Sequence, residues 1–82
     1  MRKESIEVFP NPANTELRLR QGFREKPDEY NVTIYNMQGK AVKNYTAKFP
    51  ETILDISQLL PGVYCLKIQG NGVCRTERVV KE

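Results

Sequence analysis

The sequence contains no histidine and no tryptophan among its 82 residues. Without histidine, the chain lacks the usual general base at neutral pH, the commonest metal ligand and the partner that activates serine or cysteine nucleophiles. The carboxylates show no pairing that indicates acid–base catalysis. Two cysteines alone do not complete a four-ligand zinc site. We therefore expect neither an enzyme nor a metal or cofactor site.

The sequence also has no long apolar run. Its longest stretches, such as Ile53-Leu54 and Leu59-Leu60, fall far short of the ~18 residues of a membrane-spanning helix. Met1-Arg2-Lys3 resembles the start of a signal peptide, but no apolar segment follows it. We expect no transmembrane segment, and any export signal would lie elsewhere. Residues 1–5 are interpreted as a linker or the start of an excised fragment, and residues 6–82 as one domain.

The charges are scattered, with 13 Lys and Arg against 10 Asp and Glu, for a net charge of +3. A nucleic-acid surface normally clusters cations among aromatic side chains, so nucleic-acid binding is not expected. Alternation along the expected strands places several cations outward. They would form ordinary solvated faces or, depending on strand order, a cationic face for an anionic glycan or an acidic partner. These candidates are Arg18, Arg20, Lys43, Lys67 and Arg75.

Apolar and polar residues alternate with a period of two through most of the chain, as in Tyr64-Cys65-Leu66-Lys67-Ile68. This period predicts strands, and no window shows the apolar stripe of a helix. The expected strands lie near residues 5–9, 15–20, 30–36, 40–46, 52–56, 63–69 and 73–80. Seven short strands at this spacing predict an all-β, immunoglobulin-like β-sandwich. The expected inward residues are Ile6, Val8, Leu17, Leu19, Val32, Ile34, Val42, Leu54, Ile56, Leu59, Tyr64, Leu66, Ile68 and Val79.

Proline, glycine and asparagine separate these strands. Pro10-Asn11-Pro12 predicts a rigid corner, and Asn36 to Gly39 predicts a hairpin loop in which Gly39 takes a positive φ. Ser57 is expected to cap a short turn from which Leu59 enters the core. Gln21 to Glu29 is polar and is expected to be a surface loop.

Leu60-Pro61-Gly62-Val63-Tyr64 predicts a tyrosine corner. Pro61-Gly62 suits the centre of a type II turn. In such a corner the tyrosine ring packs in the core and its hydroxyl bonds to the backbone a few residues upstream. We therefore interpret Tyr64 as structural before we assign it any binding role.

Cys65 and Cys74 lie on consecutive expected strands around Gly70-Asn71-Gly72. A two-residue loop at Gly70-Asn71 would pair Gln69 with Gly72, Cys65 with Thr76 and Cys74 with Lys67. The two thiols would then share a face at a diagonal separation of about 7–8 Å. A disulfide needs Cα atoms within about 6.8 Å, so free thiols are predicted.

The order of four motifs is more specific than any one of them. The first motif is the Pro-Asn-Pro corner within Ile6 to Asn14, and the second is the hairpin within Val32 to Lys40. The third is the tyrosine corner within Leu54 to Tyr64, and the fourth is the basic and apolar segment from Arg78 to Glu82. In this order and spacing they closely resemble the C-terminal sorting domain carried by cargo of the type IX (Por) secretion system of Bacteroidetes. The resemblance covers residues 6 to 81.

This resemblance implies a domain at the end of a larger exported protein, delivered to the periplasm by the Sec machinery. The outer-membrane translocon and its shuttle proteins would recognise the domain. A sortase-like cysteine protease usually removes it, and the cargo reaches the outer membrane, the cell surface or the medium, often joined to anionic lipopolysaccharide. The motif residues carried over are Pro10, Asn11, Pro12, Gly39, Leu59, Gly62, Tyr64, Arg78, Val79, Val80 and Lys81. The family gives Cys65 and Cys74 no role.

We hypothesise that the final strand, Val73 to Val80, presents an edge or a charged face to the translocon. Two alternatives belong to other classes. One is an adhesive or glycan-binding sandwich with exposed aromatic platforms, for which Phe9, Phe23, Tyr35, Tyr45 and Phe49 are candidates. The other is a retained anchor that binds anionic lipopolysaccharide through the cationic face, with salt-sensitive affinity.

Overall fold

The computed structural model describes residues 6–21, 29–48, 51–70 and 73–82. This part of the chain forms seven strands and no helix, which confirms the predicted all-β class. Each strand begins and ends within two residues of its expected bounds. The strands are β1 (Ile6–Phe9), β2 (Glu16–Gln21), β3 (Glu29–Tyr35), β4 (Ala41–Lys48), β5 (Glu51–Asp55), β6 (Gly62–Gly70) and β7 (Val73–Lys81).

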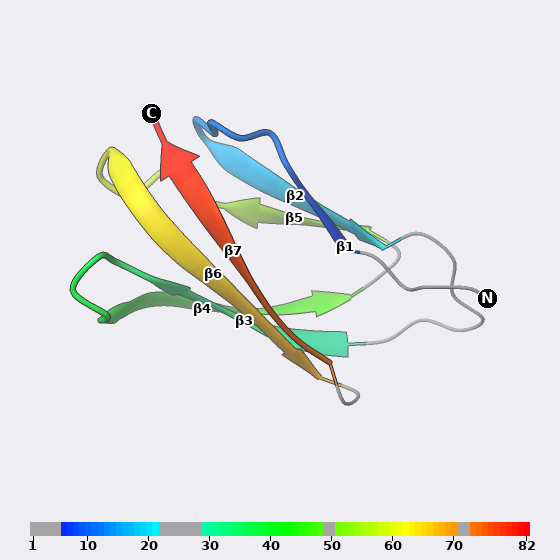
Figure 1. Ribbon diagram of the computed structural model, residues 1–82. Coiled ribbons are helices and arrows are strands. Elements are labelled where there is room, and N and C mark those ends of the chain that lie inside the picture. The colour runs from blue at the N-terminus through cyan, green and yellow to red at the C-terminus, as the bar shows by residue number, and fades with distance from the viewer. Residues whose placement is uncertain (1–5, 22–28, 49–50, 71–72) are drawn as a thin grey trace.

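The strands form two antiparallel sheets that pack as a β-sandwich (Figure 1). The three-stranded sheet has the order β1-β2-β5, and the four-stranded sheet has the order β4-β3-β6-β7. Immunoglobulin domains place their first, second and fifth strands in one sheet and pair their third with the last two in the other. This chain follows that arrangement, and β4 joins the sheet of β3.

The core lies between the two sheets and comes from the alternate residues that face inward. Every expected inward residue is either buried or packed against the buried cluster. The sequence interpretation missed Ala13, Tyr30, Ala47 and Tyr45, which are also buried or packed there. Tyr30 is directly opposite Ala47 in the register of β3 and β4, so a large and a small side chain fill one layer of the core.

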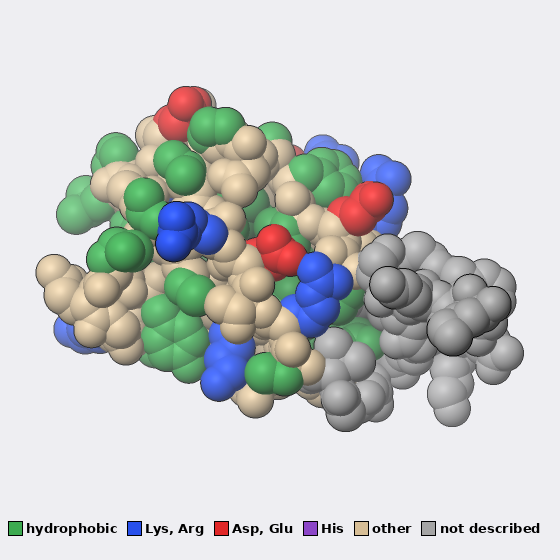
Figure 2. Space-filling model, in the orientation of Figure 1, with side chains coloured by type: hydrophobic (Ala, Val, Ile, Leu, Met, Phe, Trp, Pro, Cys, Tyr) green, Lys and Arg blue, Asp and Glu red, His purple; other side chains and the backbone are tan. Residues whose placement is uncertain are grey.

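One end of the sandwich gathers three strand connections and the last residue. We call it the motif end: the β1–β2 connection (residues 10–15), the β3–β4 connection (residues 36–40), the β5–β6 connection (residues 56–61) and Glu82. These segments lie together at the left and top of Figure 1, opposite the end marked N. Hydrophobic side chains are frequent on the surface at this end (Figure 2), where Met37 and Leu60 are exposed.

Two local expectations were wrong. Gln69 pairs with Cys74, and Gly70 pairs with Val73. The β6–β7 register is therefore shifted by two residues from the predicted one, because β6 continues through Gly70. In the β5–β6 connection, Asp55 Oδ1 accepts hydrogen bonds from the backbone N–H and the hydroxyl of Ser57. Asp55, rather than Ser57, therefore caps this turn. The loop expected at Gln21 to Glu29 lies mostly outside the described residues, and its two end residues belong to β2 and β3.

Candidate functional site

The Asn11 side chain joins the first sorting motif to the last strand. Its Nδ2 donates to the carbonyl oxygen of Arg78 over 3.0 Å. Its Oδ1 accepts from the backbone N–H of Val80 over 3.0 Å. One primary amide thus makes the two hydrogen bonds that a neighbouring strand residue would make with β7. The peptide bonds before Pro10 and Pro12, on either side of this residue, are both cis.

Ala13 continues this pairing with its backbone. Its N–H donates to the Val80 carbonyl over 2.7 Å, and its carbonyl accepts from the Glu82 N–H over 2.7 Å. We call residues 11–13 the clasp. The clasp covers the outer edge of β7 from Arg78 to Glu82, so this part of the edge is closed to an added strand. Strand addition to β7, as hypothesised from the sequence, would therefore be limited to the part of its outer edge around Cys74 and Thr76, which no described residue covers.

Tyr64 forms the predicted tyrosine corner. Its hydroxyl donates to the Leu60 carbonyl over 2.6 Å. Its ring packs against the core, as does Leu59. The expected type II turn at Pro61-Gly62 was wrong, because Gly62 has a φ of +156° and begins β6, whereas that turn needs a φ of about +80°. Across β6 and β7, Tyr64 is opposite Val79, and Gly62 is opposite Lys81. The third motif, at the start of β6, is therefore paired with the last motif, at the end of β7.

Lys81 is unusual among the cations because only 8% of it is exposed. It borders the end of the core together with Leu59, Tyr64 and Val79, so its aliphatic stem covers apolar surface. Its Nζ donates to the Glu82 carbonyl oxygen over 3.1 Å. Lys81 therefore contributes to packing at the end of the core rather than to an exposed binding surface.

The β3–β4 connection is fixed mainly by one side chain. Asn36 Oδ1 accepts from the backbone N–H groups of Gln38 and Lys40, each over 3.0 Å. Gly39 donates its N–H to the Asn36 carbonyl and has a φ of +84°, as predicted. A side chain is disfavoured in this left-handed conformation, which gives a physical reason for glycine there.

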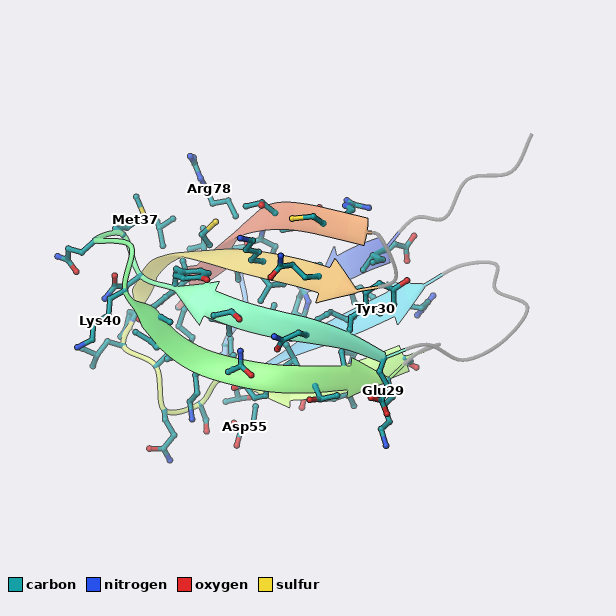
Figure 3. The ribbon with its side chains drawn as sticks, turned by 90° about the horizontal axis from the view of Figure 1, so that it is seen from below. Glu29, Tyr30, Met37, Lys40, Asp55 and Arg78 are labelled. Carbon is teal, nitrogen blue, oxygen red and sulfur yellow. The ribbon has the colours of Figure 1, made fainter. Side chains whose placement is uncertain are left out.

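A groove on the outer face of the four-stranded sheet brings motif residues together. It has a volume of about 560 Å³ and is open to solvent. Gly39, Tyr64 and Arg78, from three separate motifs, all line it. Figure 3 shows Met37, Lys40 and Arg78 at the same end of the molecule, away from Glu29 and Tyr30. The remaining lining residues are Tyr35, Asn36, Met37, Val63, Cys65 and Thr76.

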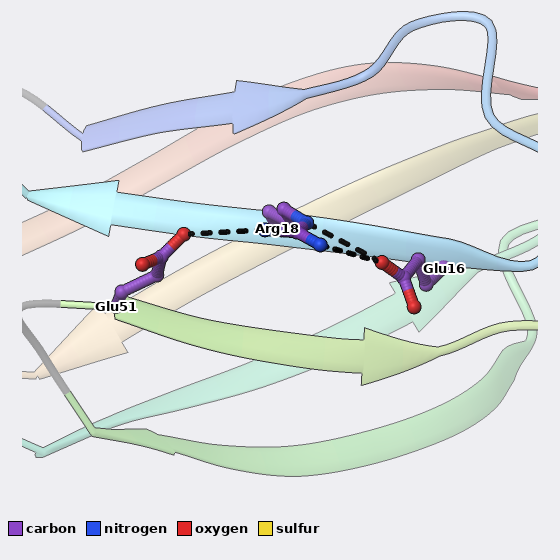
Figure 4. Close-up of polar contacts among 3 residues, drawn as sticks. All are labelled: Glu16, Arg18 and Glu51. Atoms are coloured by element: carbon purple, nitrogen blue, oxygen red, sulfur yellow. Dashed lines mark hydrogen bonds and ion pairs between the residues drawn. The ribbon is translucent and has the colours of Figure 1, made fainter.

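The structure does not bring the five candidate cations onto one face. Arg18 and Arg20 alternate with the inward Leu17 and Leu19, so they lie on the outer face of the three-stranded sheet. Arg18 pairs with Glu16 at 3.2 Å and with Glu51 at 3.9 Å (Figure 4). The guanidinium carbon of Arg20 lies 5.1 Å from the centre of the Phe9 ring. Carboxylates therefore surround Arg18, and a cation covers one of the candidate aromatic platforms.

The other three cations lie on the four-stranded sheet, and only Lys67 points outward as expected. Lys43 is opposite the buried Ile34, and Arg75 is opposite the buried Ile68. Because directly opposed residues share a face, the outward placement of Lys43 and Arg75 was wrong. The Arg75 guanidinium pairs with Glu77 at 2.6 Å. The five candidate cations, all in the described part of the chain, therefore form no single face that would support the glycolipid-anchor alternative.

The outward aromatic side chains do not form a platform in the described residues. Tyr45 packs against the core, and its hydroxyl donates to the Asp55 carbonyl. Phe23 and Phe49 lie outside the described residues.

Burial, and secondarily the Asp55 charge, raises the pKa of the Tyr45 phenol. Hydrogen bonds from Ser57, first from its backbone, lower the pKa of the Asp55 carboxyl.

Cys65 and Cys74 are free thiols, as predicted. Cys65 is opposite Arg78, and Cys74 is opposite Gln69. The two cysteines are therefore separated by four positions along β7, or about 13 Å. Cys65 lines the groove, a location that no local sequence pattern predicts. The role of Ala13 was also missed, because an alanine in a turn carries no signal for backbone pairing.

The described residues contain neither a membrane-spanning helix nor a cluster of metal-ligating side chains. No helix there is long and apolar enough to cross a membrane. No cluster of three or more cysteine, aspartate or glutamate side chains suited to a metal ion occurs there.

Comparison with known proteins gives one family. The model of the secretion system C-terminal sorting domain matches residues 7–82, which is nearly the whole chain. No curated protein matches the sequence. The family consists of sorting signals rather than enzymes, and its members direct export through the type IX system to the cell surface or beyond. The chain belongs to the family of type IX secretion C-terminal sorting domains.

Proposed function

We propose that the type IX outer-membrane translocon and its shuttle proteins recognise the motif end of this domain as a folded signal. The cargo would be the protein to which the domain is attached. Its route would run through the periplasm to the outer membrane, and then to the cell surface or the medium. A sortase-like cysteine protease would remove the domain, and the released cargo would be joined to anionic lipopolysaccharide.

The observation that carries this proposal is the hydrogen bonding of Asn11 to β7. The Asn11 side chain alone bonds to Arg78 and Val80, which follow it by 67 and 69 positions in the sequence. A motif spread over the whole chain is therefore one local surface only when the domain is folded. An unfolded segment would present these residues separately, so the geometry supports a signal that acts in the folded state.

Asn11 and Val80 join the first motif to the last strand, and the other nine motif residues divide into two groups by exposure. Leu59, Tyr64, Val79 and Lys81 are buried or half-buried and hold the motif end together. Pro10, Pro12, Gly39, Gly62 and Arg78 are exposed. We assign recognition to the exposed group and the shape of the surface to the buried group.

A secretion assay tests this proposal. Residues 1–82 are fused behind a Sec signal peptide and a fluorescent protein, in a bacterium with an intact type IX system and in its translocon mutant. We expect fluorescence outside the first strain and in the periplasm of the second, and the fragment size on a blot reports removal of the domain. Periplasmic retention in both strains, with the domain resistant to protease, would contradict the proposal.

A fusion lacking residues 78–82 provides the matched variant. This deletion removes the part of β7 that the clasp pairs with, and we expect export to be lost while the fluorescent protein stays folded. Export at the level of the full domain would show that the joined motifs are not the signal.

A further inference from the structure

The groove on the four-stranded sheet combines an apolar surface with a single cation. Met37 and Val63 contribute apolar side chains, and Cys65 adds a half-buried thiol. Among the described residues, Arg78 is the one charged residue that lines it, and no carboxylate does. A site of this composition suits a ligand with an apolar group and one negative charge.

Arg78 is available to such a ligand. Its side chain is exposed and has no carboxylate partner among the described residues, whereas Arg18, Arg75 and Lys48 each have one. Its backbone is held on both sides, by pairing with Cys65 in β6 and by the Asn11 amide at its carbonyl. The clasp and β6 therefore fix the backbone of Arg78 at the border of the groove, and no described carboxylate pairs with its guanidinium.

We propose that this groove binds an extended acidic peptide segment of a partner protein. One of its apolar side chains packs against Met37 and Val63, and a carboxylate two residues along, on the same side of the extended peptide, pairs with the Arg78 guanidinium. Asn36 and Thr76 supply hydrogen-bonding groups along the groove, and flexible methionine adapts to varied side chains. The identity of that partner as an export component rests on the proposed function.

The charge of the groove favours a peptide over a glycolipid. A polyanionic lipid or glycan surface is attracted by several clustered cations, whereas one cation lines the groove among the described residues. A single guanidinium instead matches one carboxylate through two parallel hydrogen bonds.

The two thiols of the chain provide the test, because Cys65 lines the groove and Cys74 does not. The probe is a synthetic peptide of about eight residues, a length that suits an extended groove ligand. Serine fills every second position, and leucine and aspartate alternate at the others, so that both point to the same side of the peptide. Its ends are acetylated and amidated. The control peptide carries asparagine at every aspartate position. The measured quantity is the alkylation rate of Cys65 in a Cys74→Ser variant, and of Cys74 in a Cys65→Ser variant.

We expect the aspartate peptide to slow alkylation of Cys65 and leave that of Cys74 unchanged. Arg78→Glu should weaken this protection by about tenfold or more, since it removes a charge-assisted pair. Arg78→Lys should weaken it less, because it keeps the charge but loses the planar fork. Lys48→Glu is the matched control and should leave the protection of Cys65 unchanged. Lys48 lies in β4 and pairs with Glu29, at the end of the molecule opposite Arg78 (Figure 3). Arg78 and Lys48 are both exposed, so the unfolding midpoints of the variants at these two positions should remain close to that of the parent.

Three results would overturn the proposal: equal protection by the asparagine peptide, equal protection of Cys74, or full protection in Arg78→Glu. Protection only by vesicles of anionic lipid would assign the groove to a membrane instead. The secretion assay separates this proposal from the proposed function. Export of an Arg78→Glu fusion at the parent level would remove the groove from sorting and leave the sorting function intact. If the parent fusion is not exported but the peptide still protects its Cys65, the peptide-binding groove would stand and the proposed sorting function would be refuted.

Discussion

At the scale of single residues, two motif positions, Asn11 and Tyr64, are explained by hydrogen bonds that few other side chains could make. Asn11 both donates to and accepts from β7. An aspartate at this position could accept but could not donate, and an alanine could do neither. Tyr64 similarly combines an apolar ring with one hydroxyl that reaches the Leu60 carbonyl. The motif thus reflects geometry as much as recognition.

Tyr64→Phe should destabilise the domain by about 0.5–1.5 kcal/mol, the usual net contribution of one hydrogen bond. The ring would still pack against the core, so only the bond to Leu60 is lost. Tyr35→Phe is the control, because the Tyr35 hydroxyl has no hydrogen bond in the described residues and its loss should cost little. Urea unfolding measures both. Equal midpoints for the two variants would contradict the tyrosine corner.

Asp55 should titrate below the ordinary range of an aspartate. The Ser57 backbone N–H, the Ser57 hydroxyl and the Lys43 charge all lower its pKa, in that order of size. A carboxyl whose pKa is lower in the folded state contributes stability above its unfolded pKa, and this contribution is lost as the pH falls through the folded pKa. NMR titration should show a partial rise of this pKa in Ser57→Ala, because the backbone bond remains. A titration curve unchanged by that substitution would exclude the hydroxyl as a cause.

At the scale of the elements, β7 is the strand on which the motif end depends. Strand β6 pairs with β7 along its length, and the clasp pairs with the Arg78–Glu82 part of its other edge. This second pairing protects an edge that would otherwise be exposed. The same register separates the two cysteines along the hairpin.

The β6–β7 register predicts that Cys65 and Cys74 remain unpaired within one chain. Their positions are about 13 Å apart along the strands, and a disulfide cannot join Cα atoms more than about 7 Å apart. After mild oxidation of dilute protein, a thiol reagent should still detect both cysteines of each monomer. A monomeric species with a Cys65–Cys74 bond, identified by mass spectrometry, would contradict the register.

At the scale of the whole molecule, the chain brings its four motifs to one end. The antiparallel order places alternate connections at the same end of a sandwich, so the β1–β2, β3–β4 and β5–β6 connections meet the end of β7 there (Figure 1). Fold topology, rather than sequence proximity, therefore creates the candidate recognition surface.

Leu60→Ser should reduce export of a fused cargo, whereas Ile53→Ser should not. Both are exposed apolar side chains, at 76% for Leu60 and 52% for Ile53. Leu60 lies at the motif end, and Ile53 lies in β5 opposite Arg18, on the outer face of the three-stranded sheet. Since removal of an exposed side chain changes stability by no more than about 0.5 kcal/mol, a difference in export would report recognition. Equal export of the two fusions would place recognition elsewhere.

The sequence predicted the strands, the β-sandwich and the tyrosine corner because each has a local signal in alternation or turn residues. It did not predict the β6–β7 register, since a shift of two residues keeps every side chain on the same face. It also misplaced Lys43 and Arg75, which lie on the two edge strands of the four-stranded sheet. The clasp and the groove join residues that are distant in the sequence, so no local pattern could predict them.

Hydrogen exchange of the Val80 and Thr76 amides tests most directly the claim that the first and last motifs form one unit. Alternation along β7 points both N–H groups to the same outer edge, but only that of Val80 has a described partner, Asn11 Oδ1. We predict that Val80 exchanges at least about tenfold more slowly than Thr76, and that Asn11→Ala removes most of this difference, as expected for loss of one protecting hydrogen bond. Equal exchange of the two amides in the parent domain, or a difference that survives Asn11→Ala, would contradict the account.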